Sequence, residues 1–190
     1  MMISLSINNI IMKSILLQCK FLLVEFLNVS YNLMPNPIRN WYLKLFGIVI
    51  KKRSCIHRGC KFFHVGKLII GENSVVNFGC YLDNRRGIII GDNVGLAHNV
   101  KIYTLGHNID SPQFETKGNS VVIENDVFVF SNVIIMPGVT LHRNSIVLPG
   151  SVVTKSVDEC NIVGGNPAKI IRVKKDIKVP SRTYRYWFAL

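Results

Sequence analysis

Residues 123–157 read IENDVF VFSNVI IMPGVT LHRNSI VLPGSV VTKSV, and this stretch decides the fold. An aliphatic residue opens each block of six, at Ile123, Val129, Ile135, Leu141, Val147 and Val153. The same step of six recurs upstream, where it links Ile70 to Val76 and Ile90 to Leu96. Such a repeat takes precedence over the assignment of single helices and strands, because it defines the whole architecture.

A second column follows the first at a distance of four residues. It holds small or β-branched residues throughout, at Ser74, Cys80, Val94, Val100, Val127, Val133, Val139, Ser145, Ser151 and Val157. Between the columns stand Gly, Asn and Asp, which tolerate the left-handed backbone of tight corners. A period of six fits neither an α-helix nor an alternating strand, but it suits a triangular coil with three short strands per turn. A β-sandwich is the competing fold, yet its strand spacing would not stay locked to six over so many sites.

The rhythm breaks between Leu82 and Ile90 and, over a longer stretch, between Ile102 and Ile123. We expect excursions from the coil at both places, and loops on a rigid scaffold often carry function. Upstream, the apolar pattern predicts two helices, over residues 10–34 and 38–49, separated by the sequence PNP at 35–37. The expected organisation is an N-terminal helical segment (1–50), a β-helix (51–175) and a C-terminal tail (176–190). Capping of the open end of the solenoid is the preferred role for residues 181–190, and packing on a neighbour or contact with a membrane are the alternatives.

The chain of 190 residues has a formal net charge of +12, which favours anionic partners such as nucleic acid, phospholipid head groups or a phosphate-rich cofactor. No recognised nucleic-acid motif is present, so we expect no nucleic-acid binding. Five scattered cysteines without a CxxC pair predict reduced thiols and a cytoplasmic protein. No uncharged apolar run reaches the length of a membrane span. Packing of the N-terminal helices on the rest of the protein is the preferred interpretation, and docking at the inner membrane surface is the alternative.

Three stretches carry a family resemblance: IIMPGVTLHRNSIVLPGSVVTKSVDECNIVGGNPAKIIR, NFGCYLDNRRGIIIGDNV and YTLGHNIDSPQF. Between about residues 50 and 175 the sequence resembles the hexapeptide-repeat acyltransferases, in particular sugar O-acetyltransferases such as the galactoside, maltose, capsule and O-antigen acetyltransferases. The resemblance implies a mainly β protein, a left-handed parallel β-helix that assembles as a homotrimer. It also implies acetyl-CoA bound between adjacent β-helices, direct transfer of acetyl to a saccharide hydroxyl in surface polysaccharide biosynthesis, and no required metal.

By this resemblance His107, in YTLGHNID, is the catalytic general base. A neutral imidazole can take the proton of a sugar hydroxyl while that oxygen attacks a thioester. Asn77, in VNFGC, is expected to orient the acceptor through its amide, although asparagine also suits a purely structural corner. Asp83, in YLDN, is expected to bind acceptor hydroxyls or to orient a partner. Arg85 and Arg86 follow Asp83, which admits an acidic or phosphorylated acceptor.

Further positions match those at which similar enzymes contact acetyl-CoA: Ser131, Pro149, Thr154, Lys155, Lys169 and Arg172. Basic side chains at the end of the groove suit the phosphates of the nucleotide, although a solvated basic face is the other interpretation. The sequence departs from many relatives at Phe130, where they have glycine, a change that can narrow the cofactor groove.

Two other functions fit the sequence less well. A γ-class carbonic anhydrase needs zinc-binding histidines at a subunit interface, and the five histidines show no such spacing. A catalytically inactive β-helix that serves as a scaffold is the second alternative, and the presence of both His107 and Asn77 argues against it. No motif identifies the acceptor sugar or the hydroxyl that is acetylated.

Overall fold

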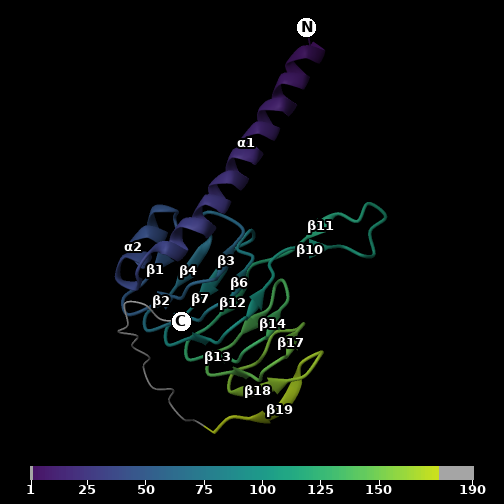
Figure 1. Ribbon diagram of the computed structural model, residues 1–190. Helices are drawn as coiled ribbons and strands as arrows, with labels where there is room; N and C mark the ends of the chain where they lie inside the picture. The colour runs from purple at the N-terminus through teal and green to yellow at the C-terminus, as the bar shows by residue number, and fades with distance from the viewer. Residues whose placement is uncertain (1, 176–190) are drawn as a thin grey trace.

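The protein is a left-handed parallel β-helix with helices at one end (Figure 1), and the computed structural model describes the backbone of residues 2–175 and side chains from residue 11 onward. Three sheets form the sides of a triangular prism. Face A consists of β1 (Val49–Ile50), β4 (Leu68–Ile70), β7 (Ile88–Ile90), β12 (Val121–Ile123) and β15 (Thr140–Leu141). Face B consists of β2 (Cys55–Ile56), β5 (Val75–Val76), β8 (Gly95–Leu96), β13 (Phe128–Val129), β16 (Ile146–Val147), β18 (Asn161–Gly164) and β19 (Lys169–Val173). Face C consists of β3 (Lys61–Phe62), β6 (Tyr81–Leu82), β9 (Lys101–Ile102), β14 (Ile134–Ile135) and β17 (Val152–Val153).

The two predicted columns fill the interior of the prism, which confirms the predicted fold. Every position in them is at most 5% exposed. Parallel pairing stacks equivalent aliphatic residues of successive coils, so that Ile123 is in register with Ile90 of the preceding coil and with Leu141 of the next. Burial of each such side chain stabilises the fold by about 1.5–3 kcal/mol relative to its exposure. The columns begin one coil earlier than predicted, because Ile50, Ile56 and Phe62 are also buried.

The corner between faces A and B (the A/B corner) shows why asparagine and aspartate recur in the repeat. The third residue of each of these corners has a φ between +54° and +63°, at Asn73, Asn93, Asp126 and Asn144. Side chains one position earlier cap the neighbouring coil, since Asp92 accepts a hydrogen bond from the Glu72 backbone N–H at 2.6 Å and Asn125 accepts one from Asp92 at 2.8 Å. The corners thus satisfy backbone groups that the short strands leave unpaired.

The two predicted excursions differ in kind. Between Leu82 and Ile90 the chain makes a tight corner rather than a projecting loop, because the buried Asn84 donates to the His64 and Gly66 carbonyls at 2.8 and 2.7 Å. The longer break contains the two-stranded hairpin β10 (Gly106–His107) and β11 (Thr116–Lys117), which projects from the solenoid (Figure 1). Only the second prediction is confirmed in full.

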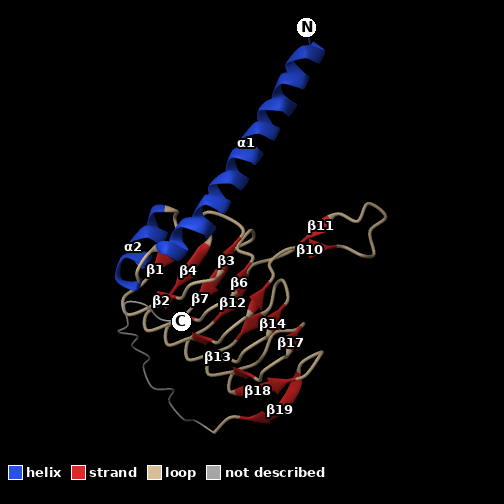
Figure 2. Ribbon diagram, viewed as in Figure 1, coloured by secondary structure: helices blue, strands red, loops and turns tan. Residues whose placement is uncertain are grey.

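Helices cover the N-terminal end of the prism, as Figure 2 shows. They are α1 (Met2–Ser30), the 3-10 turn η1 (Tyr31–Leu33) and α2 (Asn36–Leu45), so α1 starts earlier and α2 ends earlier than predicted. Leu27, Tyr31 and Leu43 join the core. The Tyr31 hydroxyl donates to the Cys60 carbonyl at 2.7 Å, and Arg39 Nη1 donates to the Ile56 carbonyl at 3.0 Å. These helices therefore close the first coil, which agrees with the preferred interpretation.

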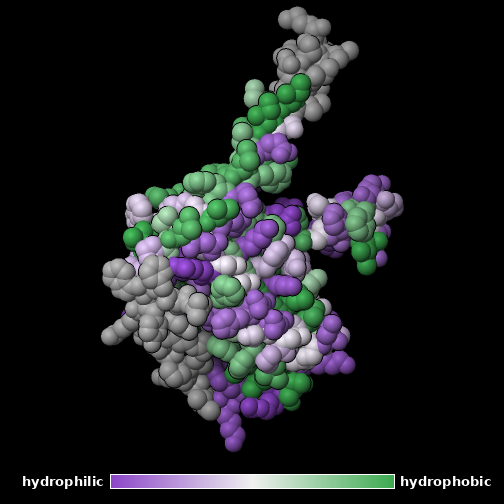
Figure 3. Space-filling view, in the orientation of Figure 1, coloured by the Kyte–Doolittle hydropathy of each residue, from purple (hydrophilic) through white to green (hydrophobic). Residues whose placement is uncertain are grey.

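The other half of α1 leaves the body of the protein. Between residues 11 and 29 it exposes many large apolar side chains: Ile11, Met12, Ile15, Leu16, Leu17, Phe21, Leu22, Leu23, Phe26 and Val29. Figure 3 shows this apolar surface continuing onto the body. Within the described chain no helix is both long enough and apolar enough to cross a membrane. The predicted capping tail, 176–190, lies outside the described residues.

Candidate functional site

Face C lies between two corners that carry the predicted site residues. The chain enters each strand of face C from the corner shared with face B (the B/C corner) and leaves it at the corner shared with face A (the C/A corner). Asn77, Ser131 and Pro149 stand at the B/C corner. The hairpin with His107 leaves from the C/A corner, where Thr154 and Lys155 also stand. The two sets therefore flank one face rather than meet at one point.

His107 is exposed on the hairpin and is held in a defined orientation. Its Nδ1 lies 2.9 Å from the Phe114 carbonyl oxygen, and its ring is stacked on that of Phe114 at 4.6 Å with an interplanar angle of 8°. Because a carbonyl can only accept, Nδ1 must carry the hydrogen. In the neutral ring Nε2 then has the free lone pair, which is the atom a general base uses.

Asn77 is half-buried next to the start of β6. Its backbone N–H donates to the Leu96 carbonyl at 2.9 Å, and its own carbonyl accepts the Cys60 thiol at 3.3 Å. Both backbone groups are thus used in stacking the coils. Among the described residues, none is hydrogen-bonded to the side-chain amide of Asn77, so this amide is available to a ligand.

Asp83 is fully buried, so direct contact with an acceptor does not fit this geometry. The Arg85 guanidinium donates two hydrogen bonds to the Asp83 carboxylate, from Nε to Oδ1 at 2.7 Å and from Nη2 to Oδ2 at 2.9 Å. Burial alone would raise the pKa of Asp83, but these bonds, the charge of Arg85 and the backbone N–H groups of Arg85 and Thr104 hold it below its ordinary value. Burial therefore contradicts the predicted contact with acceptor hydroxyls, whereas the alternative, orientation of a partner, fits because Asp83 holds the exposed Arg85 side chain.

The predicted cofactor residues occupy the C-terminal coils. Ser131 and Pro149 stand one coil apart, since the Gly150 backbone N–H donates to the Ser131 carbonyl at 3.0 Å. Lys155 and Lys169 line one pocket of about 310 Å³, together with apolar residues that include Val153 and Ala168. Thr154 is exposed beside this pocket, and Arg172 is exposed on β19. The structure therefore brings the two lysines together and leaves Arg172 outside the pocket.

Phe130 lies at the B/C corner with 38% of its surface exposed. Its ring packs edge-on against Phe128, at 4.6 Å and 81°, and Phe128 belongs to a strand of face B. The ring of Phe130 is therefore anchored on the face B side of the corner, rather than across the strands of face C.

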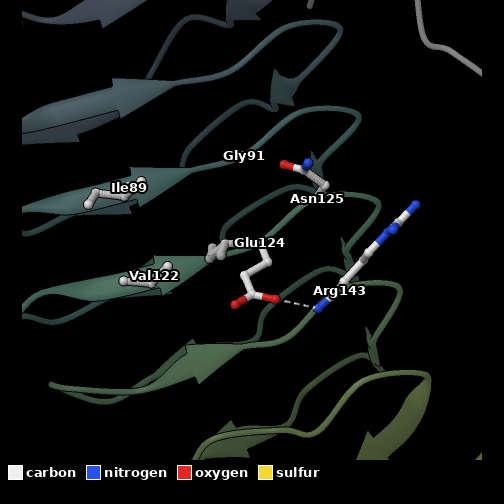
Figure 4. Close-up of a pocket in the computed structure, with 7 residues that line it drawn as sticks. Ile89, Gly91, Val122, Glu124, Asn125 and Arg143 are labelled. Atoms are coloured by element: carbon white, nitrogen blue, oxygen red, sulfur yellow. Dashed lines mark hydrogen bonds between the residues drawn. The ribbon is translucent and has the colours of Figure 1, made fainter.

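A second pocket of about 300 Å³ lies at the A/B corner and contains none of the predicted residues (Figure 4). Glu124, Asn125 and Arg143 line it. Glu124 accepts the Arg143 backbone N–H at 2.9 Å and contacts His142 Nδ1 at 3.1 Å, and Arg143 pairs with Asp126 at 3.3 Å. These bonds join successive coils, so the polar groups here are used in stacking the solenoid.

Sequence reasoning missed three aromatic residues of face C, Phe63, Tyr81 and Tyr103. The available signal was the 20-residue step of the first coils, which places Phe63 and Tyr103 at equivalent outward positions two coils apart. No group of three or more His, Cys, Asp or Glu side chains that could hold a metal ion occurs among the described residues.

Comparison with known proteins agrees with the fold. Residues 120–155 match the family model described as bacterial transferase hexapeptide (six repeats). The galactoside O-acetyltransferase of Escherichia coli (strain K12) is 33% identical over 134 residues, which are 67% of this chain and 62% of that protein. The chain thus spans less than two thirds of the length of this curated relative.

Two solved structures align over more of their length. A maltose O-acetyltransferase from Clostridium difficile 630 is 30% identical, with a TM-score of 0.76 over 85% of this chain and 89% of that one. A hexapeptide-repeat acetyltransferase from Vibrio cholerae O1 biovar eltor, complexed with acetyl coenzyme A, is 29% identical, with a TM-score of 0.75 over 84% and 89%. The chain belongs to the hexapeptide-repeat acyltransferase family.

Proposed function

We propose that this protein is an acetyl-CoA-dependent O-acetyltransferase that acts on a saccharide hydroxyl, with residues 51–175 as the catalytic domain. The named activities of its relatives support this function, because sugar O-acetylation recurs among them and one was solved with acetyl coenzyme A. The fold alone would not suffice, since one scaffold can carry several chemistries.

The geometry of His107 is the observation that carries the proposal. Its Nδ1 hydrogen is committed to the Phe114 carbonyl, so Nε2 is the atom that accepts the acceptor hydroxyl proton. The hydroxyl oxygen then forms a bond to the thioester carbonyl carbon, the carbon–sulfur bond breaks, and the thiolate of coenzyme A takes up the proton. The side-chain amide of Asn77 orients the hydroxyl.

The C-terminal coils supply the donor site in this proposal. Lys155 and Lys169, which share one pocket, would hold phosphate groups, with Arg172 beyond them on β19. Ser131, Pro149 and Thr154 would line the path of the cofactor along the edges of face C. The anchoring of Phe130 against Phe128 supports an open path past that corner.

A homotrimer is part of the same proposal. The hairpin carries His107 away from the coils of its own chain (Figure 1), so the neighbouring β-helix of a second copy is the natural surface for it to meet. Family resemblance gives the number of subunits. A substrate in surface polysaccharide biosynthesis follows from the same resemblance.

We also propose that the protein is cytoplasmic and makes peripheral contact with the inner membrane surface. The apolar side chains around α1 and the exposed Lys44, Lys51, Lys52 and Arg53 support such contact, because apolar insertion and attraction to anionic lipid reinforce each other. Flotation with vesicles of anionic and of neutral lipid tests it. Binding that is unchanged by Leu16→Glu together with Leu22→Glu would refute insertion of α1.

Thiol release from acetyl-CoA, measured with a panel of neutral and acidic sugars and sugar nucleotides, tests the catalytic proposal. We expect acceptor-dependent release that falls by about 10²–10⁴-fold in His107→Ala. Binding of acetyl-CoA should persist in that variant. A protein that neither binds nor turns over acetyl-CoA with any acceptor would instead be a scaffold.

A further inference from the structure

Three aromatic rings form a continuous ladder on the outer side of face C, across its first three strands. Phe63 and Tyr81 have ring centroids 4.4 Å apart, and Tyr81 and Tyr103 have centroids 5.1 Å apart. The ring planes are inclined to one another by 46° and 44°, and all three side chains are half-buried. Since the rings do not lie parallel in a closed stack, part of their apolar surface remains available to a ligand.

Cationic groups surround this ladder. Lys61 Nζ and Arg85 Cζ each lie 5.8 Å from the centroid of the Phe63 ring. Residues 57–67, 77–87 and 97–105, which make up face C and its corners in the first three coils, contain six lysines and arginines and a single carboxylate. That carboxylate is Asp83, which is buried and paired with Arg85. The accessible charge of this surface is therefore positive.

On this surface the side chain of Arg85 is held in one position by its contacts with Asp83. Its Nε and Nη2 bind Asp83, which in turn receives the Thr104 backbone N–H at 3.4 Å, while the Arg85 side chain stays 44% exposed. The Thr104 hydroxyl donates to the Asp83 carbonyl at 2.6 Å and fixes the corner. A guanidinium has five N–H donors, and those directed away from Asp83 remain for a ligand. Because its side chain is already ordered, little rotamer entropy is lost on binding.

The place of the ladder matches the needs of an acceptor site. Asn77 precedes β6 at one edge of face C, and Tyr103 lies four residues before His107 at the other. Four residues span at most about 13 Å, which leaves room for a disaccharide-sized acceptor. The ladder therefore lies between the two residues to which the proposed function assigns the acceptor.

We propose that Phe63, Tyr81 and Tyr103, with Arg85 at their edge, form the acceptor platform and that it selects an anionic saccharide. The apolar face of a sugar ring lies on the aromatic ladder, and Arg85 binds an anionic group of the same ligand, with Lys61 and Lys101 beside it. The anionic group is a carboxylate on the sugar or a phosphate linked to it. This inference rests on the proposed function for the transfer step, but the binding does not require acetyl-CoA.

Titration calorimetry of the full chain tests the platform without acetyl-CoA. The probes are a glucuronate-containing disaccharide, its neutral glucose counterpart and a glucose nucleotide that carries a diphosphate. We expect at least one anionic probe to bind about tenfold or more tightly than the neutral one at low salt. Dependence on Arg85 with the glucuronate probe alone assigns the anion to a carboxylate, and dependence with the nucleotide alone assigns it to a phosphate.

Matched variants isolate the roles of the charge and the rings. Asp83→Asn with Arg85→Gln removes both charges of the pair, so it leaves no buried unpaired carboxylate, and it should reduce the anionic preference to about threefold or less. Arg85→Lys is the second variant, to be used if the double variant does not fold. It should lose most of the preference for anionic probes, because an ammonium group cannot donate the two parallel hydrogen bonds of a guanidinium. Tyr81→Leu should weaken neutral and anionic probes alike. Arg143→Gln removes an exposed, carboxylate-paired arginine at the opposite corner and should change neither affinity.

Equal affinity of the wild type for neutral and anionic probes, or a preference unchanged in both Arg85 variants, would overturn the platform. Acetyl-CoA binding is measured separately on the same samples. If acetyl-CoA does not bind, the proposed transferase activity is refuted, while the saccharide-binding results still decide whether the platform exists. Normal turnover with neutral sugars that is unchanged in Tyr81→Leu and in the Arg85 variants would support the transferase activity and refute the platform.

Discussion

Removal of the hairpin should abolish catalysis while leaving the solenoid intact. The perturbation deletes residues 106–117 and joins Leu105 directly to Gly118. A Cβ built on Gly118 would lie 2.8 Å from the Leu105 Cα and 2.1 Å from the Thr104 carbonyl oxygen. Adding one C–C bond of about 1.5 Å to the first distance bounds the two Cα atoms at about 4.3 Å, close to the 3.8 Å of a trans peptide. The join therefore needs little movement of β9 or β12.

The expected change in stability is small because two terms oppose each other. Within one subunit the hairpin contributes two residue pairs and one ring stack, which are mostly exposed and together worth about 1 kcal/mol. Shortening the loop from about 14 residues to about two returns about 1.7 kcal/mol of closure entropy. The net change should lie within about 1 kcal/mol, or about 2–4 °C in Tm for a chain of this size.

Thermal unfolding by circular dichroism and thiol release from acetyl-CoA provide the two measurements. Activity should fall by about 10²–10⁴-fold, as in His107→Ala with the hairpin intact, which is the matched control. A fall of Tm by more than about 10 °C would refute the structural independence of the hairpin. Retention of a tenth or more of the activity would refute the role of His107.

Other predictions concern the stability of the solenoid, at its core, its corners and the ion pair of Asp83 and Arg85. Ile123→Ala, at a fully buried site between Ile90 and Leu141, should cost about 3–4 kcal/mol in urea unfolding, whereas Ile89→Ala, at an outward site 44% exposed, should cost about 1 kcal/mol; equal costs would contradict the inward and outward alternation. Gly91→Ala places a Cβ 2.3 Å from Asn125 Oδ1 and 2.9 Å from its backbone nitrogen, so it should cost more than about 2 kcal/mol, while Gly150→Ala meets no atom within 4 Å and should cost about 1 kcal/mol for its positive φ. The pKa of Asp83 is lowered in the folded protein, so its pairing stabilises the fold above the ordinary aspartate pKa and this contribution is lost as pH falls through the lowered value. Urea midpoints should therefore differ between the wild type and Asp83→Asn at pH 7 and converge as the pH falls below the ordinary aspartate pKa; a difference that stays constant through the acid range would exclude Asp83 as the titrating group.

The solenoid itself could be predicted from particular residues. Ile123 to Val153 and the column four residues later face the interior because a three-sided coil repeats its geometry every six residues, and each coil meets an almost identical neighbour. The first coil was missed because Phe62 lies eight residues before Ile70, and the extra two residues form a corner held by Asn84. Such a corner depends on a side chain from the following coil, a contact that a local repeat does not encode.

Local motifs indicated His107 and Asn77, whose roles remain predictions, whereas the burial of Asp83 was not predicted. Its sequence shows a carboxylate in a corner but not that Arg85 covers it, since the order of a few residues does not determine which side chain points outward. The aromatic ladder was hidden for a similar reason. Phe63, Tyr81 and Tyr103 are about 20 residues apart, and only the stacking of coils brings their rings within about 5 Å of each other.

The sequence by itself determined the left-handed β-helix family, the buried columns, the position of the projecting hairpin and the histidine it carries, because each of these depends on local periodicity or a short motif. Only the tertiary structure decided what faces outward on face C. The tautomer of His107 depends on a contact across the hairpin, and the continuous ladder of rings depends on contacts between coils. Asp83 and Arg85 are only two residues apart, but the corner that buries Asp83 also receives the Thr104 backbone N–H from the next coil. The contacts between coils arise because parallel stacking brings residues one full turn apart within a strand spacing of about 4.8 Å.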